Sequence, residues 1–292
     1  MSTLRLVPFG PPATSALQEA IAAAKGSDPL QPVTVAVPSN YAGLSLRRRL
    51  GASQGGLVNV GFIVFSRVAE LLGSPALASA GKRPLTSPVR AEAVRAALAA
   101  EPGIFATVRE HTSTERSLEA TFRELRRAPD GSLDLIGGQN ARAADVVRLY
   151  RDFRRRTAAC YDEEDLAFAA AGAVAAAALA LRDIGHVILF LPRRLSPGES
   201  ALADALAGEG RLSAIVGLSG EDSIDDATRQ IATQLAVRLG QATEEKTAER
   251  DGDSRIVLVT DAEEEVRTVL RLISERLAAG VPLHRIDRTS VV

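Results

Sequence analysis

The sequence predicts an α/β fold, built on a parallel β-sheet and interrupted by a helical insertion. Short apolar runs rich in β-branched residues recur along the chain, and most of them are followed by a segment with helical periodicity. Between residues 80 and 183, in contrast, helical segments follow one another without a convincing strand. Repeated strand and helix units bury a sheet under helices on both faces, so we expect a doubly wound layer with a helical subdomain inserted into it.

Six runs are expected to form the strands. They are short, apolar throughout and bounded by Pro, Gly or Ser, as is typical of central strands in a parallel sheet that helices cover on both faces. The runs cover residues 4–9, 33–38, 58–66, 186–192, 212–220 and 255–261.

Helices are expected after most of these strands, and the whole pattern predicts five segments. The helical periodicities outside the insertion cover residues 15–25, 41–51, 66–73, 198–208 and 262–280. The predicted segments are the first part of an α/β domain (1–79), the helical insertion (80–183), the second part of the domain (184–240), a polar linker (241–254) and the start of a second α/β domain (255–292). One strand and one helix cannot bury a sheet alone, so we expect further chain to complete the second domain.

Composition excludes several classes of protein. The 35 Lys and Arg residues almost balance the 36 Asp and Glu residues, so any binding to DNA must come from local patches. The single cysteine, Cys160, excludes an internal disulfide framework and a Cys-based zinc site. The N-terminus has no basic leader or apolar core, and no apolar run is long enough to cross a bilayer. We therefore expect a cytoplasmic protein that does not contact a membrane.

Residues 4–25 have the layout of a phosphate-binding strand, loop and helix, but they lack the phosphate-binding residues. In the P-loop pattern GxxxxGK[ST], the second Gly lets backbone N–H groups approach the phosphates, the Lys neutralises them and the hydroxyl ligates Mg²⁺. Aligned on Gly10, these three positions hold Ser15, Ala16 and Leu17. We expect ATP chemistry to be lost, while the dipole and free N–H groups of the helix still attract an anion. The alternative is an ordinary tight turn of an unrelated α/β protein.

Five blocks carry a resemblance to a known family. They follow the second and third predicted strands, end the insertion, span the fourth strand with its helix and begin the last predicted segment. The blocks cover residues 37–51, 58–73, 161–171, 187–206 and 261–286. In order and spacing they resemble the N-terminal region of AddB/RexB-type subunits, the helicase-like partners in ATP-dependent helicase–nuclease complexes. The resemblance implies a RecA-like fold of the P-loop NTPase and superfamily 1 helicase type.

This resemblance also implies a second lost site. Such helicases place an acidic pair after an apolar strand to hold Mg²⁺, and the alignment puts Phe190 and Leu191 there. A domain without either site is expected to be non-catalytic and to need no cofactor, with ATP and Mg²⁺ bound by an AddA-like helicase–nuclease partner. The implied setting is exonuclease processing of double-strand breaks for homologous recombination and DNA repair.

DNA contacts are expected from two basic clusters and one aromatic residue. The clusters are Arg47, Arg48 and Arg49 and, in the insertion, Arg154, Arg155 and Arg156. Arginines in such runs bind phosphates without reading sequence, although such runs are also typical of solvated helix faces. Tyr41 follows the second strand, where related helicases contact DNA, and it either stacks on a base or satisfies a loop with its hydroxyl.

The remaining polar groups do not predict a catalytic centre. The acidic runs at 162–165 and 263–265 are typical of helix starts, and the histidines His111, His186 and His284 are scattered along the sequence, so no metal site is expected. Two functional alternatives to the non-catalytic helicase-like domain stay open. One is an active nucleotide hydrolase with an unorthodox phosphate loop, and the other is a purely structural interaction domain.

Overall fold

The computed structural model describes residues 3–52, 56–129, 131–176, 180–245, 257–283 and 286. Contacts between residues divide the chain into two units, 1–247 and 248–292. In the part of the chain that the structure describes, no helix is both long enough and apolar enough to cross a membrane.

The predicted α/β class is confirmed in the first unit, which is built on a six-stranded sheet. Its strands lie in the order β3-β2-β6-β7-β1-β8, and every neighbouring pair is parallel. The strands are β1 (Leu4–Pro8), β2 (Val33–Val37), β3 (Val60–Val64), β6 (His186–Phe190), β7 (Leu212–Leu218) and β8 (Thr243–Glu244).

Five of the six predicted strands are confirmed, and the sixth is wrong where it can be compared. Residues 257–261 form no strand, and residues 255–256 lie outside the described residues. The sixth strand of the sheet is β8, which lies inside the predicted linker and pairs with Arg5 and Leu6 of β1. A two-residue strand has no apolar periodicity of its own, so its position depends on β1 rather than on a local sequence signal.

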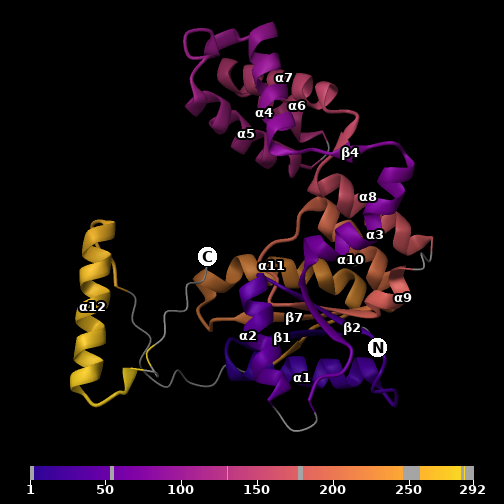
Figure 1. Cartoon of the computed structure of the whole chain (residues 1–292), viewed down its shortest axis with the longest axis vertical. Coiled ribbons are helices and arrows are strands. Elements are labelled where there is room, and N and C mark those ends of the chain that lie inside the picture. The colour runs from indigo at the N-terminus through magenta and orange to yellow at the C-terminus, as the bar shows by residue number, and fades with distance from the viewer. Residues whose placement is uncertain are drawn as a thin grey trace. The chain divides into compact units, whose positions relative to one another are not determined.

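Helices cover both faces of the sheet (Figure 1). Those of the first unit's α/β layer are α1 (Pro11–Lys25), α2 (Asn40–Gly51), α3 (Phe65–Ser79), α8 (Glu163–Ala175), α9 (Ala180–Ile184), α10 (Pro197–Gly208) and α11 (Asp222–Leu239). Helices α1 and α2 pack on one face, and α3, α8, α10 and α11 pack on the other. Strand β6 shows the alternation that this requires, because Ile188 and Phe190 face α1 and α2 while Val187 and Leu189 face the opposite layer.

Between β3 and β6 the chain runs through a series of helices, and only some of them stand away from the sheet. A bundle formed by α4 (Ser87–Ala100), α5 (Thr112–Arg126), α6 (Ser132–Gly137) and α7 (Ala141–Arg156) projects beyond α3 and α8 (Figure 1). A short 3₁₀ turn, Gly103–Phe105, follows α4. The bundle core includes Leu118, Phe122, Leu149 and Phe153. Strands β4 (Arg83–Pro84) and β5 (Cys160–Tyr161) pair beside each other where the chain enters and leaves the bundle.

Helix α8 follows the bundle in the chain and packs between α3 and α10. It approaches each of these helices closely at a glycine. A methyl group on Gly73 of α3 would lie 2.3 Å from the carbonyl oxygen of Leu166, and one on Gly198 of α10 would lie 2.9 Å from Ala167 Cβ. Only glycine permits such close approach of the helices. The predicted insertion 80–183 therefore contains both the projecting bundle and two helices of the sheet layer.

The second unit contains one regular element among its described residues, helix α12 (Ala262–Ala278). The Asp261 side chain caps it by accepting a hydrogen bond from the N–H of Glu264 at 2.8 Å, and Glu263, Glu264 and Glu265 occupy its first turn. The predicted helix start is confirmed. His284 lies outside the described residues.

Candidate functional site

The connection between β1 and α1 is shorter than predicted. The helix was expected from Ser15, but it begins at Pro11, so only Phe9 and Gly10 separate it from the strand. Gly10 has a φ of 91°, a conformation that favours glycine. The helix starts early because proline presets a helical φ and is favoured in the first turn. A two-residue connection cannot wrap around a phosphate group as a P-loop does.

The first turn of α1 has fewer donors for an anion than an ordinary helix start has. Pro11 and Pro12 have no N–H, and the N–H of Thr14 donates to the carbonyl of Gly10 at 3.2 Å. The expectation that this helix N-terminus still attracts an anion stays a prediction, and it depends on the N–H groups of Gly10 and Ala13, which donate to no described residue. Ser15 is exposed on the helix, whereas Ala16 and Leu17 are fully buried against the sheet. These residues do not fit ATP or Mg²⁺.

Phe190 and Leu191 close the end of β6. Phe190 is buried in the core under α1 and α2, and the Leu191 N–H donates to the carbonyl of Ile215 at 2.8 Å. Leu191 has a φ of 52°, which is strained for a residue with a side chain. Neither side chain can ligate a metal, and their assignment as a lost acidic pair stays a prediction.

The carboxyl ends of the strands form an edge where the direction of the chain reverses. From β2 the chain moves through α2 to β3, whereas from the adjacent β6 it moves through α10 to β7, in the opposite direction along the sheet. Ligands of open α/β sheets bind at such a switch point, beyond the carboxyl ends of the strands. We name the exposed side chains that follow these strands, Phe9, Tyr41, Arg193 and Arg194, the carboxyl edge.

The carboxyl edge combines aromatic and cationic groups that are open to solvent. Phe9 is 52% exposed after β1, and Tyr41 is 67% exposed at the start of α2. Arg193 and Arg194 are exposed after β6 and form no ion pair with any described residue. The exposure of Tyr41 rules out the alternative in which a half-buried tyrosine forms a hydrogen bond from its hydroxyl to the backbone of the loop. Three strand spacings, roughly 14 Å, separate β1 from β2, so the edge is wide enough for more than one nucleotide.

The predicted cluster Arg47, Arg48 and Arg49 lies elsewhere on α2. All three residues are exposed near the C-terminus of the helix, and none forms an ion pair with a described residue. Arg49 is eight residues beyond Tyr41, which corresponds to about 12 Å along the helix axis. The structure therefore does not bring this cluster to the carboxyl edge, although its arginines are available to an anion.

The second predicted cluster, at the end of α7, is largely neutralised. Arg154 contacts Asp162 at 3.1 Å, and both Arg155 and Arg156 contact Asp152, at 2.9 and 2.7 Å. An arginine that already has a carboxylate partner must exchange it in order to bind a phosphate. The alternative of a solvated helix face therefore describes Arg155 and Arg156 better than a DNA contact does.

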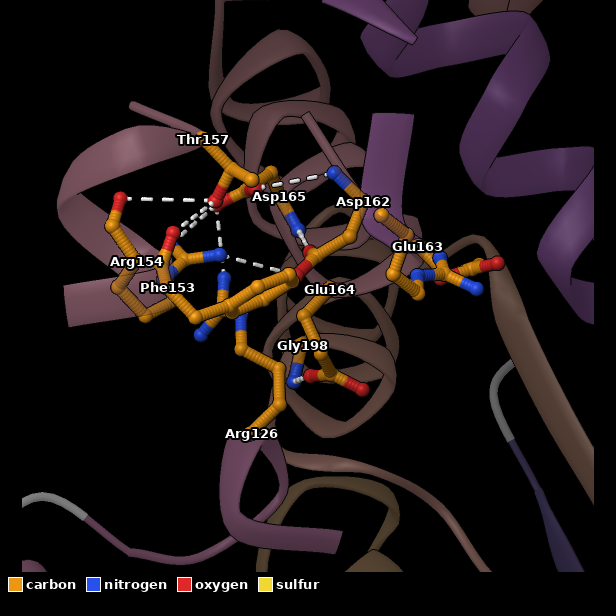
Figure 2. Close-up of polar contacts among 10 residues, drawn as sticks. Arg126, Phe153, Arg154, Thr157, Asp162, Glu163, Glu164, Asp165 and Gly198 are labelled. Atoms are coloured by element: carbon orange, nitrogen blue, oxygen red, sulfur yellow. Dashed lines mark hydrogen bonds and ion pairs between the residues drawn. The ribbon is translucent and has the colours of Figure 1, made fainter. Parts of the chain in front are cut away.

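An ion-pair network joins the bundle to α8, and the sequence analysis did not predict it (Figure 2). Arg126 of α5 donates to Asp162 at 2.9 Å and to Asp165 at 2.7 Å, and Arg154 of α7 donates to the same Asp162. Asp162 and Asp165 also form the capping box of α8. We name these four residues, Arg126, Arg154, Asp162 and Asp165, the junction network. Arg126 and Asp162 are 36 residues apart, so no local pattern indicates their pairing.

The junction network holds Asp162 in its charged form. Burial acts to raise the pKa of Asp162, but the N–H of Asp165 and the guanidinium of Arg126 outweigh it, so the pKa lies below its usual value. Beside the network lies a cavity of about 370 Å³, between the bundle and helices α3, α8 and α10. It is the second candidate site, and of its arginines and aromatic residues the sequence analysis had singled out only Arg154, as a DNA contact.

Other titratable groups do not gather into a site within the described ranges. No three His, Cys, Asp or Glu side chains lie close enough together there to hold a metal ion. His186 Nε2 lies 2.8 Å from Ser213 Oγ at the start of β6 and β7, and burial lowers its pKa to about 4. His111 begins α5, and Cys160 lies in β5.

The chain was compared with known proteins by two searches. No family model matches it, and a search of curated proteins returns no match.

Proposed function

We propose that this chain is a non-catalytic, helicase-like domain that holds single-stranded DNA beside a motor and nuclease partner. The partner is an AddA-like subunit that binds ATP and Mg²⁺ and hydrolyses ATP. Together they would process double-strand ends by helicase and exonuclease action for recombinational repair.

A RecA-like fold is part of this proposal. The parallel sheet, with helices on both faces, is compatible with that fold, and the bundle is inserted between the third and fourth strands along the chain. The resemblance of the five sequence blocks to AddB/RexB-type subunits supports the same fold. It is this resemblance, rather than the sheet alone, that leads to a helicase-like function, since one α/β fold hosts many functions.

One observation carries the proposal. The carboxyl edge exposes aromatic and unpaired cationic side chains, whereas the loop that would bind nucleotide phosphates in such a fold is short and is followed by two prolines. Pro11 and Pro12 remove phosphate donors, whereas Tyr41, Arg193 and Arg194 are exposed. Arginines attract the phosphates of a strand and aromatic rings stack on its bases, without the need for a nucleotide cofactor. The hydrolase alternative would need several phosphate donors in the first turn of α1, where Pro11 and Pro12 have none.

Binding of a labelled single strand, measured by fluorescence anisotropy over a range of salt concentrations, tests the proposal. We expect binding that weakens steeply with salt, because phosphate contacts release counterions. We also expect no ATP hydrolysis above background. Absence of strand binding at low salt would favour the structural interaction domain, and ATP hydrolysis abolished by substitutions in residues 10–17 would favour the hydrolase.

A further inference from the structure

The cavity at the junction has the size of a binding site for a small molecule or a single nucleotide. Its volume is about 370 Å³, and pockets that hold such ligands start at roughly 300 Å³. The rings of Phe122, Tyr150 and Phe153 line it on the side of the bundle, and Glu164 of α8 lines it on the side of the sheet layer. The cavity thus combines ring surfaces with carboxylates, of which Glu164 is one. Other lining carboxylates already have partners, because Asp162 pairs with Arg126 and Arg154, Glu163 with Arg90 and Glu199 with the N–H of Ser196, and Glu119 lines the cavity as well.

Glu164 has a carboxylate oxygen without a partner. The residue is 6% exposed, and its Oε2 accepts a hydrogen bond from the N–H of Gly198 at 2.9 Å (Figure 2). Its Oε1 accepts no hydrogen bond from any described residue. A buried carboxylate oxygen without a donor is costly, and buried polar groups are almost always hydrogen-bonded. A ligand that brings a donor to Glu164 would satisfy this oxygen.

Tyr150 is a second buried polar group without a partner. It is also 6% exposed, and its hydroxyl forms no hydrogen bond with a described residue. Burial raises the pKa of Tyr150, so the hydroxyl stays protonated and can both donate and accept. Two orphaned polar groups from different elements thus line the same cavity.

The cavity also has arginines that are free to bind an anion. Arg126 and Arg154 are held by the aspartates of the junction network. Arg123 of α5 and Arg127, directly after this helix, also line the cavity, are exposed and form no ion pair with a described residue. A ligand that carries a phosphate can place it at these two guanidinium groups.

We propose that the junction cavity binds one unpaired nucleotide of a single strand, whose base donates an amino group to Glu164 and whose phosphate contacts Arg123 and Arg127. A carboxylate is an acceptor only. The one donor on the edge of thymine, N3–H, lies between two carbonyl oxygens that a carboxylate repels, so Glu164 favours bases with an exocyclic amino group over thymine. Flat bases outside a duplex are read in this way, by hydrogen bonds at their edge and by contact with aromatic rings. The inference depends on the proposed binding of single strands and adds a preference among them.

Labelled dC15 and dT15 strands, compared by anisotropy at pH 7.5, test this cavity. Both strands are flexible pyrimidine runs, and only cytosine has an amino group. We expect the protein to bind dC15 about tenfold more tightly than dT15, as is typical of one well-placed contact to a base. Competition with dCMP and dTMP shows whether the cavity also takes free nucleotides, with the same preference for cytosine.

Glu164→Gln is the matched variant, because it keeps the size of the side chain and an oxygen for the N–H of Gly198. Its amide NH₂ would then face the cavity as a donor, which suits the O4 of thymine rather than the amino group of cytosine. We expect this variant to lose or reverse the preference. A paired substitution, Arg123→Ala with Arg127→Ala, is expected to weaken both strands equally and to lower the salt dependence.

The outcomes separate this inference from the proposed function. Equal affinity of the unsubstituted protein for dC15 and dT15 would overturn the cavity proposal and leave strand binding intact. Retention of the preference in a folded Glu164→Gln variant would overturn the role of Glu164. The comparison of dC15 with dT15 uses the unsubstituted protein, so it tests the cavity proposal even if a substitution prevents folding. Failure to bind either strand would overturn both proposals.

Discussion

The carboxyl edge and the junction network use the same residue type in opposite ways. Arg193 and Arg194 at the edge are exposed and unpaired, whereas Arg126 and Arg154 at the junction are partly buried and held by Asp162 and Asp165. Unpaired arginines are available to a phosphate, and paired ones join two parts of the fold. The density of arginines in the sequence therefore does not predict where a strand binds, since two runs, 47–49 and 154–156, are equally dense and only the second is paired with aspartates among the described residues.

Removal of the shared aspartate is expected to break the junction. Asp162→Ala would leave Asp165 as the remaining carboxylate for Arg126 and Arg154, at 2.7 and 3.7 Å, and would remove the cap of α8. Loss of a cap costs about 1 kcal/mol, and loss of one of two carboxylates beside partly buried arginines adds to it, so we expect a loss of about 2 kcal/mol in the free energy of unfolding. Urea denaturation measures it.

Asp134→Ala is the control for this prediction. Asp134 is 80% exposed in its own ion pair with Arg151, and exposed pairs contribute little, typically below about 1 kcal/mol. Equal losses for the two variants would show that the junction network is no stronger than a surface pair.

As the pH falls, the effect of His186 in the sheet is expected to lower the free energy of unfolding before protonation of Asp162 in the junction network does. Burial lowers the pKa of His186 to about 4, so the unfolded chain binds the proton first and stability falls between pH 6.5 and 4. We expect a loss of about 2 kcal/mol, after allowance for partial exposure of the ring. The pKa of Asp162 is lowered as well, so its contribution is present above its unfolded pKa of about 3.9 and is lost only at still lower pH.

Unfolding free energies measured from pH 7 to pH 4 check this order. His186→Gln should flatten the slope between pH 6.5 and 4, because the titrating group is gone. A slope that is unchanged in this variant would assign the acid sensitivity to other groups.

Strand binding is expected to depend on the edge rather than on the arginine run of the insertion. Arg193→Ala combined with Arg194→Ala removes up to two phosphate contacts, so we expect about tenfold weaker binding near 0.1 M salt and a smaller salt dependence. The matched pair Arg155→Ala with Arg156→Ala should bind almost normally, since both arginines already contact Asp152. If anisotropy titrations showed that the Arg155 and Arg156 substitutions weaken binding more than the Arg193 and Arg194 substitutions do, the strand would bind to the insertion instead.

Local features of the fold could be predicted from the sequence. The helix start at Asp162 follows from a side-chain cap and an acidic first turn, which need no distant partner. The apolar runs of β2 and β7 predict buried strands from local sequence in the same way. The structure agrees, because every residue of both strands is buried. The α/β class followed from such local patterns.

Features that depend on distant contacts could not be predicted. The early start of α1 was missed because Pro11 and Pro12 were assigned to a loop, although proline is as favourable in a first helical turn. The pairing of Arg126 with Asp162, and the return of α8 to the sheet layer at Gly73, depend on packing between segments far apart in the chain. The exposure of Tyr41 likewise depends on how α2 packs, which its sequence alone does not determine.

The central claim is that a single strand lies across the carboxyl edge, and photo-crosslinking tests it most directly. Benzoylphenylalanine would replace Tyr41 at the edge or, as the control, Arg155, which is equally open to solvent on α7 at 78% side-chain exposure. With a labelled strand at low salt, the account predicts strong crosslinks from position 41 and few from position 155. Crosslinks that form mainly from position 155, or equally from both, would contradict it.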